Sequence, residues 1–431
     1  MDVRKFVKSL IPSNIFHKIE PYGHLIEAVL LNTVNGYPAR GIKVIGVTGT
    51  NGKTTTSFLI HRMLHEAGYK VGLMTTVAYG VGDDIKPQLN HMTNVPMPEL
   101  MRRLKYMRAQ GVEWLVLETT SQALAQNRVW GVSYSIAVMT NVTHEHLDFH
   151  KTFEHYRDAK VKLFGLANKN KSGLKIGVIN ADDPNAVYFS SAITNPITYG
   201  LKSGDVVARE VELSANGVKY EVEVGGETHR IDCHIPGSFN VYNSLAAVCT
   251  GRAVGLNRQQ IEQGIAALEG VEGRMTRITN DRGIDIIVDF AHTPDSFEKL
   301  FKDLKPVTKG KLIVLFGSPG RRDEVKRAIQ GKLAGQYADE VILTEEDDRD
   351  VDGLEIMEQI AKGAEKMDKI RGTDLFLIHD RSKAIKFAID RAKTGDTILL
   401  LGKGHEKTIE RADGEHPWDE IAAAYSALKH Q

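Results

Sequence analysis

Short apolar runs alternate with helical patterns along most of the chain. The first run, at residues 43–48, is followed at 54–68 by apolar residues with helical spacing. Further β-branched runs lie at 114–118, 135–140 and 175–180. Strands that alternate with helices form parallel sheets, with the helices packed on the sheet faces. The pattern therefore predicts an α/β domain with a doubly wound parallel sheet.

The pattern changes between residues 206 and 235, where polar and apolar positions alternate and Gly225 and Gly226 mark a turn. This predicts an antiparallel hairpin appended to the sheet. A second, Rossmann-like α/β series begins near Gly273, with strands expected at 284–290, 311–316, 340–344, 374–378 and 397–401. We therefore expect a short helical segment at 1–42, a central domain at 43–270 and a C-terminal domain at 271–431.

Residues 22–37 place Leu25, Ile26, Val29 and Leu30 on one face of a predicted helix. We expect this face to pack on the central domain. The alternative is a peripheral contact with a membrane or a partner chain, although the helix lacks the Lys-rich polar face that is usual for interfacial helices.

Composition excludes several classes of protein. Lys+Arg and Asp+Glu are equal at 55 each, so there is no basic footprint of a nucleic-acid-binding protein. Cys233 and Cys249 are too few for a disulfide framework or a cysteine zinc site, which favours a reducing compartment. No signal peptide and no apolar run of membrane-spanning length is evident. We expect a cytoplasmic monomer.

A glycine-rich segment connects the first strand to the first helix. Backbone N–H groups in such a loop surround phosphate oxygens, Lys53 reaches the outer phosphates, and the Thr54 hydroxyl faces Mg²⁺. The strict Walker pattern requires a glycine five positions before Gly52, where Val47 stands. The context of strand, glycines, lysine and helix still predicts an ATP-phosphate site, made of Gly49, Thr50, Asn51, Gly52, Lys53, Thr54 and Thr55.

The segment 144–150 suggests a different metal site. His144, His146, Asp148 and His150 are similar to the zinc motif of metallo-β-lactamases. That motif requires a histidine directly after the aspartate, and Phe149 stands there. The zinc-hydrolase interpretation is therefore disfavoured.

The loop sequence Gly-Thr-Asn-Gly-Lys-Thr-Thr-Thr resembles the nucleotide loop of the Mur ligases, which also departs from the strict Walker form. Further segments resemble motifs of this family, in family order, at 117–121, 140–148, 237–243, 273–275 and 289–295. Ala-His-Thr-Pro-Asp at 291–295 and Gly-Lys-Gly-His-Glu at 402–406 are most similar to the tripeptide-synthetase branch. The resemblance covers residues 43–431.

The resemblance implies an ADP-forming ligase that activates a carboxylate as an acyl phosphate and joins it to an amine in cell-wall precursor synthesis. It implies catalytic roles for Lys53, Glu118, His146, Lys160 and Arg274. The implied Mg²⁺ ligands are Thr54, Glu118, His146 and Lys160, the last as a carbamate, which supplies the oxygen donors that Mg²⁺ prefers. The implied further nucleotide contacts are Asn240, Asn243, Arg274 and Asp289.

The same resemblance implies small-molecule substrates: a muramoyl-dipeptide-like acceptor and either meso-diaminopimelate or L-lysine. Arg349 favours a second carboxylate on the amino acid, whereas Asp347 and Asp348 favour a distal ammonium group. The expected substrate residues are Thr93, Asn94, Thr120, Ser121, Arg128, His292, Arg349, Gly402 and Glu406.

Three departures from the branch keep alternatives open. First, Glu346-Asp347-Asp348-Arg349 stands where the branch has Asp-Asn-Pro followed by Arg. Second, Gln122 replaces a histidine and residues 93–96 replace a Thr-Thr-Pro motif. Third, the segment before Lys43 is shorter than the uridine-nucleotide domain of the family. We therefore expect a UDP group to contribute little to acceptor binding. A folylpolyglutamate-synthase-like or pseudopeptidoglycan ligase, or a silent nucleotide-binding partner, stays possible, although the combined presence of the implied catalytic residues argues against silence.

Overall fold

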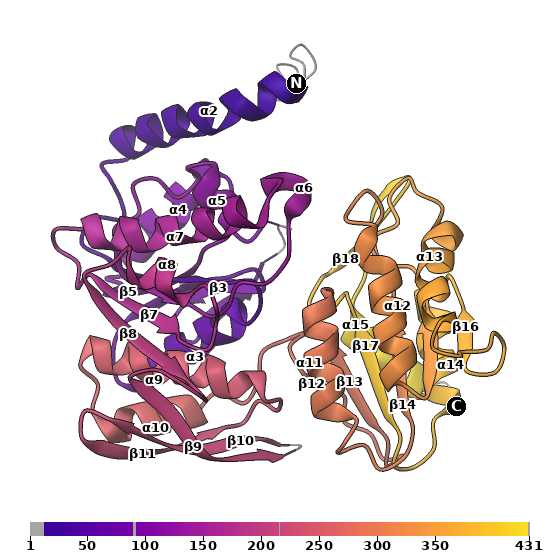
Figure 1. Cartoon of the computed structure of the whole chain (residues 1–431). Helices are drawn as coiled ribbons and strands as arrows, with labels where there is room; N and C mark the ends of the chain where they lie inside the picture. The colour runs from indigo at the N-terminus through magenta and orange to yellow at the C-terminus, as the bar shows by residue number, and fades with distance from the viewer. Residues whose placement is uncertain (1–12, 89–91, 215, 430–431) are drawn as a thin grey trace.

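The computed structural model describes residues 13–88, 92–214 and 216–429, which form two sheets with helices packed around them (Figure 1). The larger sheet has the strand order β11-β10-β9-β8-β7-β6-β1-β5-β2-β3-β4, and the smaller one has the order β12-β13-β17-β14-β15-β16. All strands of the larger sheet precede those of the smaller one in the chain. The division that we place at 270–273 falls in the connection between the two.

The centre of the larger sheet is parallel and buried on both faces. In β1, Ile45 and Val47 are fully buried, and they belong to a continuous apolar core with residues of the neighbouring helices. Burial on both faces is the reason why such strands are continuous apolar runs. The parallel strands are β1 (Lys43–Thr48), β2 (Val71–Met74), β5 (Trp114–Glu118), β6 (Tyr134–Met139), β7 (Ile176–Asn180) and β8 (Asn195–Gly200).

Helices cover both faces of this sheet and connect its strands (Figure 1). They are α3 (Lys53–Glu66), α4 (Met97–Ala109), α5 (Ser121–Ala125), α6 (Leu147–His150), α7 (Phe153–Lys169), α8 (Ala186–Ser190), α9 (Phe239–Val254) and α10 (Arg258–Ala266). The phosphate loop lies between the carboxyl end of β1 and the start of α3, the edge where parallel α/β sheets bind ligands.

Antiparallel strands extend the larger sheet at both edges. The predicted hairpin is present as β10 (Gly217–Val224) and β11 (Glu227–Cys233), with a turn at Gly225 and Gly226, which both have positive φ. The prediction was incomplete, because β9 (Val206–Ser214) is a third antiparallel strand that joins the hairpin to β8. At the other edge lie β3 (Ala78–Val81) and β4 (Asp84–Pro87).

The smaller sheet confirms the second α/β series. Its strands are β12 (Thr276–Arg277), β13 (Asp285–Asp289), β14 (Leu312–Phe316), β15 (Glu340–Leu343), β16 (Leu375–Leu377) and β17 (Thr397–Leu401), all parallel except β12. Its helices are α11 (Pro294–Leu304), α12 (Val325–Tyr337), α13 (Gly353–Glu365), α14 (Arg381–Arg391) and α15 (Glu420–Lys429). A separate hairpin, β18 (Thr408–Arg411) and β19 (Gly414–Pro417), follows β17.

The helix α2 (Ser13–Val34) lies outside the helical layer that contains α4 and α5 (Figure 1). It packs inward through Ala28 and Asn32, both fully buried, and the Asn32 Nδ2 donates to the Trp130 carbonyl at 3.2 Å. The predicted packing face was therefore wrong, because Ile26 and Leu30 point outward and are 61% and 59% exposed. None of the described helices is long and apolar enough to cross a membrane.

Candidate active site

The phosphate loop is held in place by the segment that follows β6. The Thr50 amide donates to the Asn141 carbonyl at 2.8 Å, and the Asn51 amide donates to Asn141 Oδ1 at 2.9 Å. Gly52 caps α3 with φ 81°, and a Cβ there would collide with the Asn243 side chain. The N-terminus of α3, with Thr54 and Thr55 buried in its first turn, is thus open to an anion on the loop side.

The Glu118 carboxylate lies beside this loop, at the end of β5. It is 2% exposed and accepts hydrogen bonds from Thr54 Oγ1 at 2.9 Å and from the Thr76 amide and hydroxyl, both at 3.1 Å. The Thr76 hydroxyl also contacts the Thr93 hydroxyl at 2.7 Å. Thr76 was not expected in the site, because it lies far from Glu118 in sequence and matches no motif. A buried carboxylate bonded only to neutral donors here is suited to a cation.

Lys160 projects from α7 to the underside of the phosphate loop. Its Nζ donates to the Gly49 carbonyl at 2.6 Å, and the side chain is 2% exposed. Burial, together with repulsion from Lys53, holds the pKa of Lys160 well below its ordinary value, although Glu145 and Glu118 oppose the shift. Lys53 itself donates to the Thr50 carbonyl at 2.9 Å. The site therefore brings together Lys53, Lys160 with its lowered pKa, and the carboxylates of Glu118 and Glu145.

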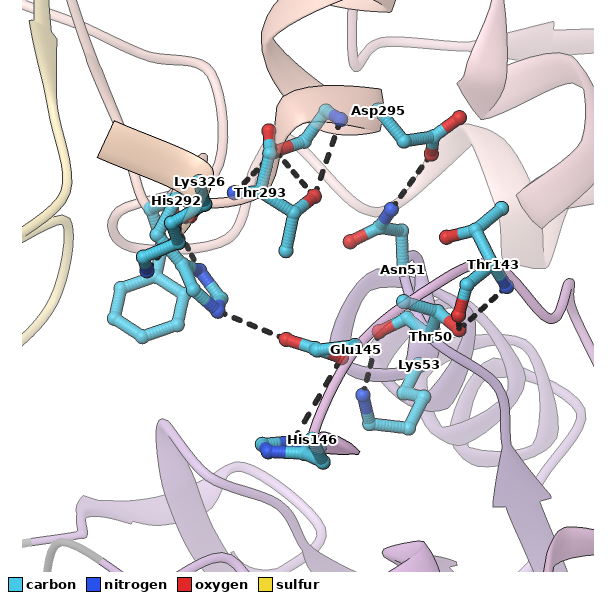
Figure 2. A network of polar contacts seen from close by, with 12 residues as sticks. Thr50, Asn51, Lys53, Thr143, Glu145, His146, His292, Thr293, Asp295 and Lys326 are labelled. Atoms are coloured by element: carbon cyan, nitrogen blue, oxygen red, sulfur yellow. Dashed lines mark hydrogen bonds and ion pairs between the residues drawn. The ribbon is translucent and has the colours of Figure 1, made fainter. Parts of the chain in front are cut away.

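Glu145 connects the loop after β6 to the smaller sheet, as Figure 2 shows. Its carboxylate lies 3.1 Å from His292 Nε2 and 3.7 Å from His146 Nε2, and it accepts from the Tyr156 hydroxyl at 3.3 Å. The other nitrogen of His292 lies 2.9 Å from the Phe290 carbonyl, so each ring nitrogen faces an oxygen acceptor. Burial alone would raise the pKa of Glu145, but His146 and His292 lower it.

The histidines around His146 do not gather as a zinc motif would require. The His144 ring packs against Phe153, whereas His150 Nε2 contacts the Ser121 hydroxyl at 3.0 Å. The side chain of Asp148 lies outside the described residues.

Of the two expected nucleotide residues from the smaller sheet, Arg274 reaches the phosphate loop and Asp289 supports the neighbouring backbone. The Arg274 guanidinium packs over the Phe290 ring and lies 3.4 Å from Thr54 Oγ1. Asp289 accepts from the Met275 and Ala291 amides at 2.8 and 2.7 Å, which fixes the backbone on both sides of it. A second contact between the two parts joins Asn51 Nδ2 to Asp295 Oδ2 at 2.9 Å (Figure 2).

On the opposite side of the loop, two expected adenine contacts lie on the first turn of α9. Asn243 Nδ2 donates to Asn240 Oδ1 at 2.8 Å, and Asn240 Nδ2 donates to the Pro236 carbonyl at 2.6 Å. Both side chains are buried. Their mutual bonding shapes the wall beside Gly52.

Three of the expected acceptor residues, Asn94, Thr120 and Arg128, form one hydrogen-bond network at the far side of Glu118. Asn94 is buried and bonds the Glu118 carbonyl at 2.8 Å and the amide and hydroxyl of Thr120 at 2.9 Å each. Arg128 donates to the Asn94 carbonyl, and Ser121 contacts His150. Asn94 thereby acts as a connector that holds Thr120 in place at the start of α5.

The expected amino-acid residues lie in a charged network of the smaller sheet. Lys403 is fully buried and contacts Asp347 at 2.8 Å and Glu406 at 2.6 Å. Burial would lower the pKa of Lys403, but these carboxylates raise it, so the ammonium stays charged. Arg349 has φ 57° and pairs with Glu410 at 2.8 Å, besides donating to the Gly320 carbonyl at 2.6 Å.

Gly402 is required at its position in this network. Its φ is +100°, and a Cβ there would lie 2.6 Å from Glu346 Oε2. Residues that sequence reasoning missed here are Lys403, whose burial is visible only in the fold, and Glu410 on the hairpin that follows.

Comparison with known proteins agrees with this geometry. The family described as Mur ligase middle domain matches residues 47–251, and the Mur ligase glutamate ligase domain matches residues 273–404. The UDP-N-acetylmuramyl-tripeptide synthetase of Roseiflexus sp. (strain RS-1) is 41% identical, over 95% of this chain and 82% of the relative.

Solved structures of related ligases are also similar to this chain. A UDP-N-acetylmuramoyl-L-alanyl-D-glutamate–2,6-diaminopimelate ligase is 32% identical, with TM-score 0.63 over 90% of this chain and 79% of that chain. A folylpolyglutamate synthase of Mycobacterium tuberculosis, complexed with ADP and AMPPCP, has TM-score 0.72 over 94% and 96% of the two chains, but at 15% identity it shares only the fold. The chain belongs to the Mur ligase family, in its tripeptide-synthetase branch, and is an ATP-dependent ligase that forms amide bonds.

Proposed function

We propose that this protein adds meso-diaminopimelate to a muramoyl-dipeptide-like carboxylate during peptidoglycan synthesis, as a monomer in the cytoplasm. The observation that carries the proposal is the buried hydrogen bond between Thr54 and Glu118 beside the phosphate loop. Lys160, whose pKa is lowered, contacts the same loop from below, and Arg274 approaches Thr54 from the smaller sheet. The acceptor network through Asn94 and the charged network around Lys403 flank this centre on either side.

The chemistry proceeds through an acyl phosphate. An acceptor carboxylate oxygen attacks the γ-phosphorus of ATP and ADP leaves; the amine then attacks the carbonyl carbon, and inorganic phosphate leaves with that oxygen. Lys53 and Arg274 are placed to offset the negative charge on the transferring group. The contacts Asn51–Asp295 and Glu145–His292 hold the two parts together over the loop, which limits hydrolysis by water.

The donor set around Glu118 fits Mg²⁺. Hydroxyl and carboxylate oxygens are the donors that this ion prefers, and the hydrogen bonds to the Glu118 carboxylate come from the neutral groups of Thr54 and Thr76. Thr54 and Glu118 would hold the ion, with His146 and a carbamate on Lys160 as further ligands. When bound, Mg²⁺ supplies charge neutralisation to the phosphates.

Carbamylation of Lys160 follows from its environment. Carbon dioxide adds to a neutral amine, and burial beside Lys53 favours the neutral form of Lys160. The carbamate would carry the negative charge that this buried pocket, with Lys53 nearby, accommodates better than a second ammonium group.

The charged network of the smaller sheet favours diaminopimelate over lysine. Asp347 is held by the fully buried Lys403 at 2.8 Å, so it is not available to a distal ammonium group. Arg349 is bonded to Glu410, which is 42% exposed, and a substrate carboxylate can replace such an exposed partner. A preference for diaminopimelate also agrees with the 32% identical solved relative, which is a 2,6-diaminopimelate ligase.

Amino-acid-dependent ADP release, together with the product mass, tests this proposal. The enzyme is incubated with UDP-MurNAc-L-Ala-D-Glu, ATP, Mg²⁺ and either meso-diaminopimelate or L-lysine. We expect a tripeptide product and a higher kcat/KM for diaminopimelate. Lys53→Ala should abolish turnover, whereas Lys86→Ala, at an exposed lysine, should leave it unchanged. A product with lysine alone would refute the assignment of the amino acid.

A further inference from the structure

The outward side of α2 is a continuous apolar surface. It consists of Ile19, Tyr22, Ile26, Val29, Leu30 and Val34, which we name the outer face, and these side chains are 36% to 82% exposed. At 3.6 residues per turn they fall within an arc of about 140°. No charged residue lies within this arc. Isolated exposed apolar residues are common, but a charge-free stripe along four turns marks an interaction surface.

The outer face is not needed to hold the helix on the protein. The inward side does this, through Ala28, through the bond from Asn32 to Trp130, and through the bond from Asn127 Nδ2 to the Pro21 carbonyl at 3.2 Å. Glu20 and Glu27 lie to one side of the helix, next to His24. Figure 1 shows α2 as the outermost element of this part of the molecule, and none of the other labelled helices or strands lies over its outer side.

A second copy of the chain is a poor partner for this surface. The outer face is about 23 Å long and about 10 Å wide, so a pair of copies would bury of the order of 500 Å². Stable dimers bury at least about 1,200 Å². A single convex helix is, by contrast, the shape of interfacial helices that lie in the plane of a membrane surface.

Basic residues in the sequence on both sides of the outer face favour a membrane with anionic lipids. Residues 1–18 contain Arg4, Lys5, Lys8 and Lys18 but only one acid, Asp2, which gives a net charge of +3 in a chain of net charge zero. Beyond the other end of α2, Arg40 and Lys43 are exposed. Basic residues next to an apolar helical face strengthen binding to anionic lipid headgroups.

We propose that the outer face of α2 binds an anionic lipid bilayer, with the helix axis parallel to the membrane surface. This inference does not depend on the reaction proposed above. It would bring the enzyme to the membrane through the side that carries α5, where the acceptor residues Thr120 and Ser121 lie.

Vesicle flotation of the full chain tests the proposal. We expect the protein to float with vesicles of phosphatidylcholine and phosphatidylglycerol, much less with phosphatidylcholine alone, and less at high salt, because salt screens the charges. Ile26→Asp combined with Leu30→Asp should lower the partition coefficient roughly tenfold or more. Val187→Asp is the matched control, since Val187 on α8 is also 61% exposed, and it should bind like the unchanged protein.

A second readout does not rely on charged substitutions. Tyr22→Trp should show a blue shift of its fluorescence with the mixed vesicles, whereas Tyr425→Trp, at a partly exposed tyrosine on α15, should not. Absence of flotation and of the shift, equal flotation of the double variant, or equal binding to phosphatidylcholine alone would overturn the proposal. So would a dimer in light scattering that the double variant dissociates, which would assign the face to a second copy.

Discussion

Arg381 is predicted to hold the amino-acid network of the smaller sheet together. Its side chain is fully buried and pairs with the fully buried Glu420 at 2.6 Å. It also donates to the carbonyls of Glu345 and Leu401 at 3.0 and 2.7 Å. These carbonyls directly precede the segments that carry Arg349 and Glu406, so one guanidinium fixes both segments.

The substitution Arg381→Met leaves the Glu420 carboxylate buried with only the Trp418 indole N–H as a partner, at 2.8 Å. Breaking a buried ion pair in this way costs about 3–5 kcal/mol. Each carbonyl that loses its donor adds about 1 kcal/mol. The expected total of about 5–7 kcal/mol is a large part of the stability of a domain.

The double variant Arg381→Met/Glu420→Met removes the unpaired charge and leaves only the neutral groups unsatisfied. We therefore expect it to be more stable than the single variant by about 2 kcal/mol or more. Lys386→Ala is the matched control on the same helix, because its pair with Asp390 is exposed and should contribute less than about 1 kcal/mol.

Urea denaturation read by hydrogen exchange of peptides from β17 and α14 measures these differences locally. A loss below about 1 kcal/mol for Arg381→Met, or a double variant less stable than the single one, would refute the reasoning. In protein that stays folded, Arg381→Met should raise the KM for the amino acid more than the KM for ATP.

Three further predictions concern individual residues. Burial lowers the pKa of His61 from 6.5 to about 4, so between these pH values the ring is neutral in the folded protein and charged in the unfolded chain. About 3 kcal/mol of stability, present above pH 6.5, should therefore be lost as the pH falls towards 4. Urea titrations at several pH values measure this loss, and His61→Leu should remove it. Lys160→Ala should abolish turnover, with partial recovery in acetate, which can fill the vacated ligand position; full activity without acetate would show that Lys160 is not catalytic. Arg349→Ala should raise the KM for diaminopimelate with little change for ATP, and an unchanged KM would contradict its placement.

The parallel strands that were predicted begin and end within one residue of the observed strands, as β1, β5 and β17 illustrate. They are buried on both faces, so burial itself makes them apolar runs. The parallel strands β2 and β8 were not predicted, and β9 was not separated from the hairpin predicted within residues 206–235. β2 has only four residues, and the first half of β8 is exposed, so neither is a continuous apolar run.

The helix α2 shows what periodicity leaves open. The spacing of Ile26, Val29 and Leu30 correctly predicts that these apolar side chains share one face of the helix. Spacing alone does not say whether that face packs on the protein or points to solvent. The protein side is occupied by the small Ala28 and the polar Asn32, whose amide satisfies backbone carbonyls. That choice depends on the shape of the surface beneath, which the helix sequence does not contain.

Some residues of the site were also predictable from sequence motifs, and others were not. Lys53, Thr54, Glu118 and Lys160 lie together as the motifs indicate. Thr76 and Glu145 were missed because their roles depend on contacts between distant segments, such as the contact from Glu145 to His292. Arg349 was expected to face substrate, and its partner Glu410 could not be inferred, since the pairing requires the β18–β19 hairpin to fold back.

Transfer of ¹⁸O from the acceptor carboxylate tests the central claim most directly. In an acyl-phosphate reaction, the oxygen that attacks the γ-phosphorus leaves with the phosphate when the amide bond forms. Acceptor labelled in its carboxylate should therefore give one ¹⁸O in each inorganic phosphate released, only when the amino acid is present and not with Lys53→Ala. Phosphate free of ¹⁸O alongside amide product would contradict the account.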